Sequence, residues 1–126
     1  MRRVVETEQA PKPIGPYSQA IDTGGIVFCA GQIGLDPATG KLVDGGVAPE
    51  AERAIANLAA VLDAVGLRLT DVVKTTLFLV DLADGPAVGK IYAAHFPAPH
   101  PARSTVQVAA LPAGAHVELE AIAVRR

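Results

Sequence analysis

The 126-residue sequence has no tryptophan, a single cysteine and an aromatic content of only 4%. Cys29 alone cannot form an intrachain disulfide, which agrees with a reducing compartment. No apolar run is long enough to span a bilayer, and the first arginines lead into Glu6 and Glu8 instead of a signal-peptide core. We therefore expect a soluble, cytoplasmic protein without membrane contact, and the length predicts one domain over residues 1–126.

A clustered basic surface is also missing. Eleven basic and thirteen acidic residues give a net charge of −2, and adjacent arginines occur only at positions 2–3 and 125–126. Proteins that bind nucleic acid need their positive charge gathered on one face. A nucleic acid is therefore not an expected partner.

Several catalytic and binding motifs are absent. The sequence has no G-x-G-x-x-G, no P-loop and no G-x-S-x-G, which argues against nucleotide binding and serine-hydrolase chemistry. His95, His100 and His116 fall on a predicted helix, loop and strand, and the sequence has no H-x₃-H or C-x₂-C spacing. No metal site is predicted.

The residues that are present predict a small α/β domain. Half are hydrophobic, chiefly Val, Ile, Leu and Ala. Strands are predicted over residues 2–6, 17–22, 26–34, 71–81, 103–109 and 116–124, and helices over 49–65 and from Asp84 as N-cap to Pro97. Residues 42–43 form either a short edge strand or the approach to the first helix. The predicted order is β-β-β-α-β-α-β-β.

Both helices have one apolar face. In the first, the stripe comprises Ala51, Ile55, Leu58, Leu62 and Val65; in the second, it comprises Val88, Ile91, Tyr92 and His95. Two helices can cover only one face of a sheet, so the other face must meet something else. A second copy of the chain is the simplest candidate, and we expect a homo-oligomer.

Arg103 is the first candidate for chemistry. It follows a proline-rich loop at a strand start, where its planar guanidinium can hold a carboxylate or phosphate through two parallel hydrogen bonds. Composition alone favours the alternative, an ordinary exposed arginine at a strand end.

Glu118 and Glu120 alternate with apolar residues in the last predicted strand, so both carboxylates lie on one sheet face. A carboxylate near the buried end of such a face can act as a general base, although a solvated strand face explains the spacing about equally well. Tyr17 follows Gly15-Pro16 and either projects into a cleft or is a half-buried core residue. Cys29 is predicted to be a small core residue.

Five segments in register resemble the reactive-intermediate deaminase family, also called Rid or YjgF-like proteins. They are Ile14-Gly15-Pro16-Tyr17-Ser18-Gln19-Ala20, Gly31-Gln32-Ile33-Gly34, Val73-Lys74-Thr75-Thr76, Pro101-Ala102-Arg103-Ser104 and Glu118-Leu119-Glu120-Ala121-Ile122-Ala123-Val124. The match covers essentially the whole chain, with a shortened stretch near residues 97–101.

The resemblance implies a chorismate-mutase-like α+β fold of the bacillus type, a mixed β-sheet with two helices on one face. It also implies a homotrimer with a central barrel and three sites in the clefts between subunits. The implied activity is that of a hydrolase acting on C–N bonds, which converts 2-aminoacrylate and related 2-imino acids into 2-keto acids and ammonia without a cofactor.

The resemblance also implies roles for individual residues. Glu118 would activate the attacking water, and Arg103 would grip the substrate carboxylate with help from the backbone amide of Thr105. Tyr17 and Gly31 would line the substrate site. At Ala30 the family usually has serine, so this chain lacks one hydroxyl group there and its catalytic efficiency is the property most affected.

Two other functions remain as alternatives. One is an endoribonuclease or translation inhibitor, a description attached to some relatives, which the scattered charge disfavours. The other is a non-catalytic trimer that binds a small ligand, which the alanine at position 30 keeps in consideration.

Overall fold

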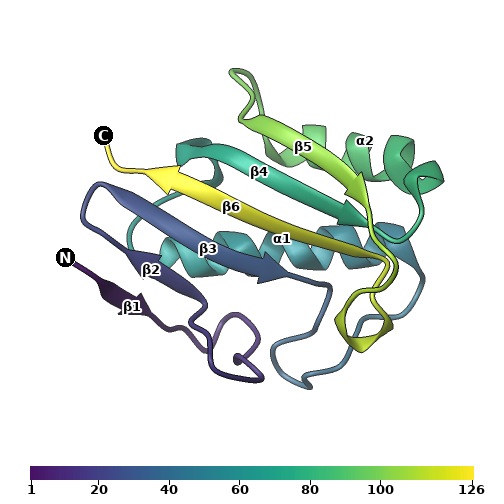
Figure 1. Cartoon of the computed structure of the whole chain (residues 1–126), viewed down its shortest axis with the longest axis horizontal. Helices are drawn as coiled ribbons and strands as arrows, with labels where there is room; N and C mark the ends of the chain where they lie inside the picture. The colour runs from purple at the N-terminus through teal and green to yellow at the C-terminus, as the bar shows by residue number, and fades with distance from the viewer.

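The computed structural model describes all residues, 1–126, and contains one mixed six-stranded sheet with two main helices (Figure 1). The elements are β1 Arg3–Val5, β2 Ala20–Asp22, β3 Ile26–Gln32, α1 Val47–Asp63, β4 Val72–Leu79, α2 Gly85–His95, β5 Ala102–Gln107 and β6 Val117–Val124. The strand order is β1-β2-β3-β6-β4-β5; only β4 and β5 run parallel. The predicted α+β class and element order are confirmed.

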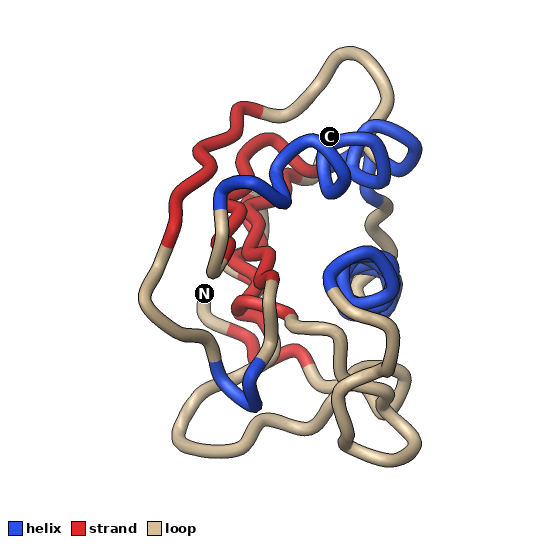
Figure 2. The backbone as a smooth tube through the Cα atoms, turned by 90° about the vertical axis from the view of Figure 1, so that its right-hand side faces the viewer, coloured by secondary structure: helices blue, strands red, loops and turns tan.

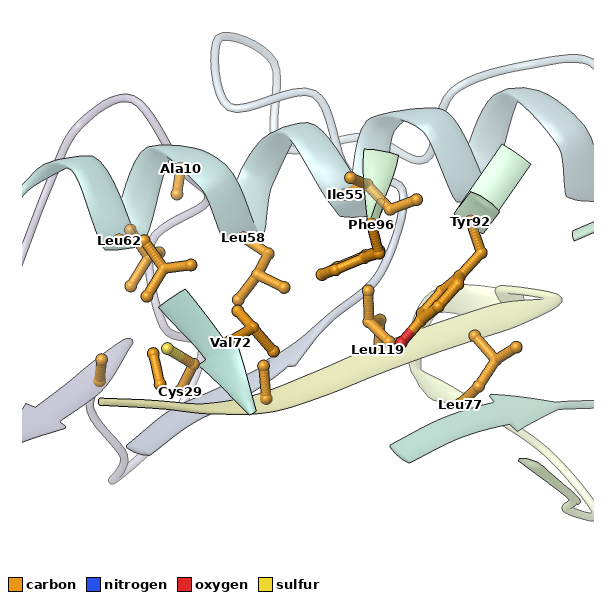
Figure 3. Packing of buried hydrophobic residues seen from close by; sticks show 14 of the residues in the cluster. Ala10, Cys29, Ile55, Leu58, Leu62, Val72, Leu77, Tyr92, Phe96 and Leu119 are labelled. Carbon is orange, nitrogen blue, oxygen red and sulfur yellow. The ribbon is translucent and has the colours of Figure 1, made fainter. Parts of the chain in front are cut away.

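Both helices pack on the same face of the sheet. Figure 2 shows the sheet nearly edge-on with α1 end-on to one side of it. The core between them contains Leu58 of α1, Phe96 at the end of α2 and Leu119 of β6, as Figure 3 shows. No helix in the structure has both the length and the apolar character that a membrane crossing requires.

The opposite face of the sheet is open. Large apolar side chains there are substantially exposed, and Phe28 of β3 is 47% accessible. Others are Ile26, Val73 and Val106. An open sheet face is what the sequence predicts from two helices, and its exposed apolar side chains are a feature of surfaces that contact other molecules.

The predicted strand over 17–22 is wrong in its first half, because β2 begins only at Ala20. Gly15 has φ of +137°, and the Tyr17 amide donates to the Gly15 carbonyl at 2.9 Å, so the chain turns here instead of extending. Residues 42–43 likewise form no strand; a single bridge joins Leu42 to Leu35.

The helices agree with the prediction except at their ends. α1 lies two residues earlier than predicted, and Gly66, with φ of +74°, follows its last turn. His95 was assigned wrongly to the buried stripe of α2: its ring bonds Glu52 at 2.9 Å near the surface, and Phe96 fills the core instead. Asp84 precedes α2 without a side-chain capping bond.

Candidate functional site

Glu118 lies one residue into β6 on the open face of the sheet. Its neighbours Val117 and Leu119 point into the core, and Glu118 itself pairs with Phe78 of β4. Burial, and secondarily the negative charge of Glu120, raise the pKa of Glu118. A half-buried carboxylate with a raised pKa is a stronger base than an exposed one, so this group suits proton transfer from water.

Gly31 lies directly against Glu118. A Cβ atom at position 31 would be 2.8 Å from the Glu118 carboxyl carbon, closer than real Cβ contacts allow. The β3–β6 ladder shifts register between Cys29 and Gln32, so Gly31 stands at an irregularity in the sheet. The absence of a side chain at this position is what lets the carboxylate occupy its place. The structure thus brings together two residues that the sequence predicts for the site.

Arg103 lies on the other face of the sheet. In β5 it pairs with Thr75, whose side chain is buried beneath the helices. Its guanidinium carbon is 4.7 Å from the centre of the Tyr92 ring of α2. A hollow beside it is lined by Gly89, Tyr92, Ala93, His100 and Pro101. One chain therefore does not bring Arg103 and Glu118 together.

Thr105 follows Arg103 by two residues in β5 and pairs with Leu77 of β4, so it shares the helix-side face. Every residue of β5 is exposed, because β5 is the edge strand of the sheet. Both predicted ligands for the substrate carboxylate thus lie on an edge that a second subunit can reach.

Tyr17 is 54% exposed and lies in the loop before β2. The only hydrogen bond of its side chain is local: the hydroxyl accepts from the amide of Ile14 at 3.3 Å. Ala30 lies nearby in the chain fold, since its amide donates to the Gln19 carbonyl at 2.9 Å. The ring of Tyr17 is therefore available to a ligand or to a neighbouring chain.

The comparisons with known proteins decide the family. A family model described as Endoribonuclease L-PSP matches residues 7–125. The human 2-iminobutanoate/2-iminopropanoate deaminase is 48% identical over 125 residues, which cover 99% of this chain and 91% of that protein. The chain belongs to this family. The predicted resemblance to the reactive-intermediate deaminases is confirmed.

Solved structures of similar proteins have the same fold. RidA from the Antarctic bacterium Psychrobacter gives a TM-score of 0.95 at 41% identity, covering 98% of this chain and 100% of that one. TdcF of E. coli, solved with bound serine, gives a TM-score of 0.92 at 41% identity, covering 98% and 99% of the two chains.

Gln19 has a structural role that the sequence patterns do not predict. Its buried side-chain amide accepts from the Thr7 amide at 2.7 Å and donates to the carbonyls of Pro11 at 2.9 Å and Thr7 at 3.0 Å. These bonds hold the segment that leads to Tyr17. The only sequence signal was an amide side chain immediately before an apolar strand.

α1 fastens the segments next to Gly31 and Glu118. The buried Asn57 donates to the carbonyls of Ile33 and Leu35 at 3.1 and 2.9 Å, just after β3. The buried Glu50 accepts from the backbone amide and the ring of His116 at 2.7 and 2.6 Å, just before β6. α1 thus helps to position both strands whose residues form the Gly31–Glu118 contact, β3 at its end and β6 at its start.

The cysteine and the histidines do not form a catalytic or metal-binding group. Cys29 is a buried core residue, as predicted, and burial raises the pKa of its thiol to about 12, so it carries no nucleophilic thiolate at neutral pH. The three histidines bond three different partners. No group of three or more His, Cys, Asp or Glu side chains is close enough to hold a metal ion.

Proposed function

We propose that this protein is an imine deaminase that hydrolyses short 2-imino acids, such as 2-iminopropanoate and 2-iminobutanoate, to 2-keto acids and ammonia. The observation that carries the proposal is the half-buried Glu118 carboxylate held against Gly31. In a chain 48% identical to a deaminase of that name, it supplies the one base that the reaction needs.

The chemistry requires few groups because the protonated imine is already electrophilic. Glu118 takes a proton from a water molecule as the water oxygen bonds to C2 of the substrate, forming a carbinolamine. A proton then moves to nitrogen, the C–N bond breaks, and ammonia leaves as the C2 carbonyl forms. Arg103 would hold the substrate carboxylate through two parallel N–H bonds, which fixes C2 relative to the base. Tyr17 and the Thr105 amide complete the proposed substrate contacts.

The proposal includes a homotrimer, with the open sheet faces forming a central barrel and one site at each subunit boundary. Two features support it. The exposed apolar side chains of the open face would be buried favourably against a second copy of the chain. Arg103 and Glu118, on opposite faces of one chain, can meet around one substrate only if each comes from a different copy.

A trapping assay tests the function. A serine dehydratase generates 2-aminoacrylate, which tautomerises to 2-iminopropanoate, and semicarbazide competes with the deaminase for the imine. The wild-type protein should speed pyruvate formation and lower semicarbazone formation, whereas Arg103→Ala and Glu118→Gln should each lose at least about 100-fold in kcat/KM. Semicarbazone formation unchanged by the wild-type protein would reject the proposal.

The family description also names an endoribonuclease, which is a second candidate. Incubation of RNA with wild type and with Arg103→Ala distinguishes the two. Cleavage that is absent in the variant supports a nuclease, and cleavage equal in both indicates a contaminant.

A further inference from the structure

We propose that Tyr92 is a positioning residue for the substrate carboxylate, because its ring holds the Arg103 guanidinium in place by a cation–π contact. The identity of the ligand rests on the proposed function. The contact itself is a feature of one chain, since α2 supplies Tyr92 and β5 supplies Arg103.

Arg103 has no other anchor in the chain. It forms no ion pair and no side-chain hydrogen bond, whereas Arg125 pairs with Asp22 and Arg126 pairs with Asp71. It stands on an exposed edge strand, where a long side chain samples many rotamers. The Tyr92 ring, 4.7 Å from the guanidinium carbon, is the one group that restricts it.

The Tyr92 ring is itself rigid. It is only 5% exposed, and its hydroxyl lies 2.8 Å from the hydroxyl of the fully buried Thr75. Phe96 stacks on the ring with 4.3 Å between centroids and 24° between planes. The guanidinium therefore rests on an aromatic surface that the core holds fixed.

This form of anchoring keeps the binding groups of Arg103 free. A carboxylate partner would neutralise the guanidinium and occupy its N–H groups, whereas an aromatic face contacts the plane of the guanidinium and leaves the edge N–H groups available. The hollow beside Arg103, lined by Gly89, Tyr92 and Ala93, leaves space for a ligand. Tyr92 thus orients the charge without competing with the substrate.

The test changes the charge distribution of the ring while keeping an aromatic ring at position 92. Position 92 is made phenylalanine in one protein and pentafluorophenylalanine in a second, because the fluorine atoms withdraw π-electron density and make the ring face electropositive. Calorimetry with 2-oxobutanoate gives Kd, and the imine assay gives KM and kcat. The fluorinated ring should raise Kd and KM by about two- to fivefold relative to Tyr92→Phe, with kcat unchanged.

If the ring at position 92 had only a structural role, the phenylalanine and pentafluorophenylalanine proteins would have equal Kd values. That result would overturn the inference. A fall in kcat at constant Kd would overturn it as well. Tyr92→Leu, which removes the ring, should weaken binding at least as much as fluorination; wild-type affinity in a folded Leu variant would contradict the proposal.

The two proposals fail in different ways. If the wild-type protein binds 2-oxobutanoate but hydrolyses no imine, the proposed function is wrong and the Kd comparison still decides the role of Tyr92. If the wild-type protein does not bind 2-oxobutanoate, the inference about Tyr92 is overturned, whatever the imine assay shows.

Discussion

Arg103 and Glu118 lie on opposite faces of one β-sheet. Arg103 pairs with Thr75 and rests on Tyr92 of α2, whereas Glu118 pairs with Phe78 and faces the side that no helix covers. Under the proposed function, each chain would therefore carry two halves of different sites: a carboxylate-binding half at its edge strand and a base on its open face. In a ring of identical subunits, every boundary then joins one half of each kind.

Mixing two inactive variants should restore activity. Arg103→Ala keeps Glu118, and Glu118→Gln keeps Arg103, so a boundary between the two variants contains one intact site. In randomly mixed equal amounts, about one quarter of the boundaries in a ring have both intact residues on the facing sides. Co-purification through two different affinity tags removes the homotrimers, and each remaining mixed trimer has one intact site among its three boundaries. The imine assay on these trimers should therefore recover about one third of wild-type activity.

Each variant alone serves as the control and should stay inactive. If both residues act from the same chain, no mixed trimer contains an intact site. Verified mixed trimers without any recovery would therefore contradict the shared site.

Glu120 should shift the pH at which activity begins. Burial and, secondarily, the negative charge of Glu120 raise the pKa of Glu118, and protonated Glu118 cannot accept a proton from water. Activity should therefore fall as pH drops through the raised pKa of Glu118. Glu120→Gln removes the like charge, lowers the pKa of Glu118 and moves the acid limb of the kcat/KM profile to lower pH. Glu52→Gln, on the exposed side of α1, is the control and should leave the limb in place.

The sequence predicts the elements well because each depends on local patterns. Alternation in β6 places Glu118 and Glu120 on one face, and the structure has them there. Alternation cannot say which face of the sheet Arg103 occupies, because that depends on the register of β5 against β4, set by contacts between distant segments. The start of β2 was missed for a related reason: Gln19 bonds to Thr7, twelve residues away, and holds the Tyr17 segment out of the strand.

The contact between Gly31 and Glu118 was equally beyond local patterns. The two residues come from strands far apart in the sequence and meet where the β3–β6 register shifts. The glycine-glutamine turn at Gly31 and the alternating strand around Glu118 can each be recognised alone. Neither pattern shows that position 31 must lack a side chain because the Glu118 carboxylate lies against it.

Gly31→Ala should damage activity while leaving the fold intact. The added methyl group would meet the flexible carboxylate end of Glu118, which can turn aside, and the backbone at Gly31 needs no positive φ. Displacement of the base should lower kcat/KM by about 10- to 100-fold. The melting temperature should stay close to that of the wild-type protein, as measured by calorimetry.

Gly34→Ala is the matched comparison. Its methyl group would meet the Cα atom and carbonyl oxygen of Glu50 at 2.7 and 2.9 Å, and backbone cannot turn aside as a side chain does. This variant should lose about 1 to 3 kcal/mol of unfolding free energy. A stability loss at Gly31 as large as at Gly34 would show that the carboxylate of Glu118 is fixed.

Gln19→Leu should loosen the segment before Tyr17. The buried amide of Gln19 bonds both backbone groups of Thr7 and the carbonyl of Pro11, and leucine satisfies none of them. The expected loss is about 1 to 3 kcal/mol of unfolding free energy, measured in urea, together with faster hydrogen exchange at the Thr7 amide. Gln9→Leu, at an exposed glutamine whose side chain makes no hydrogen bond, should change neither quantity. If Tyr17 contacts the substrate, KM should also rise in Gln19→Leu and stay constant in Gln9→Leu; an unchanged exchange rate at Thr7 would show that other contacts hold this segment.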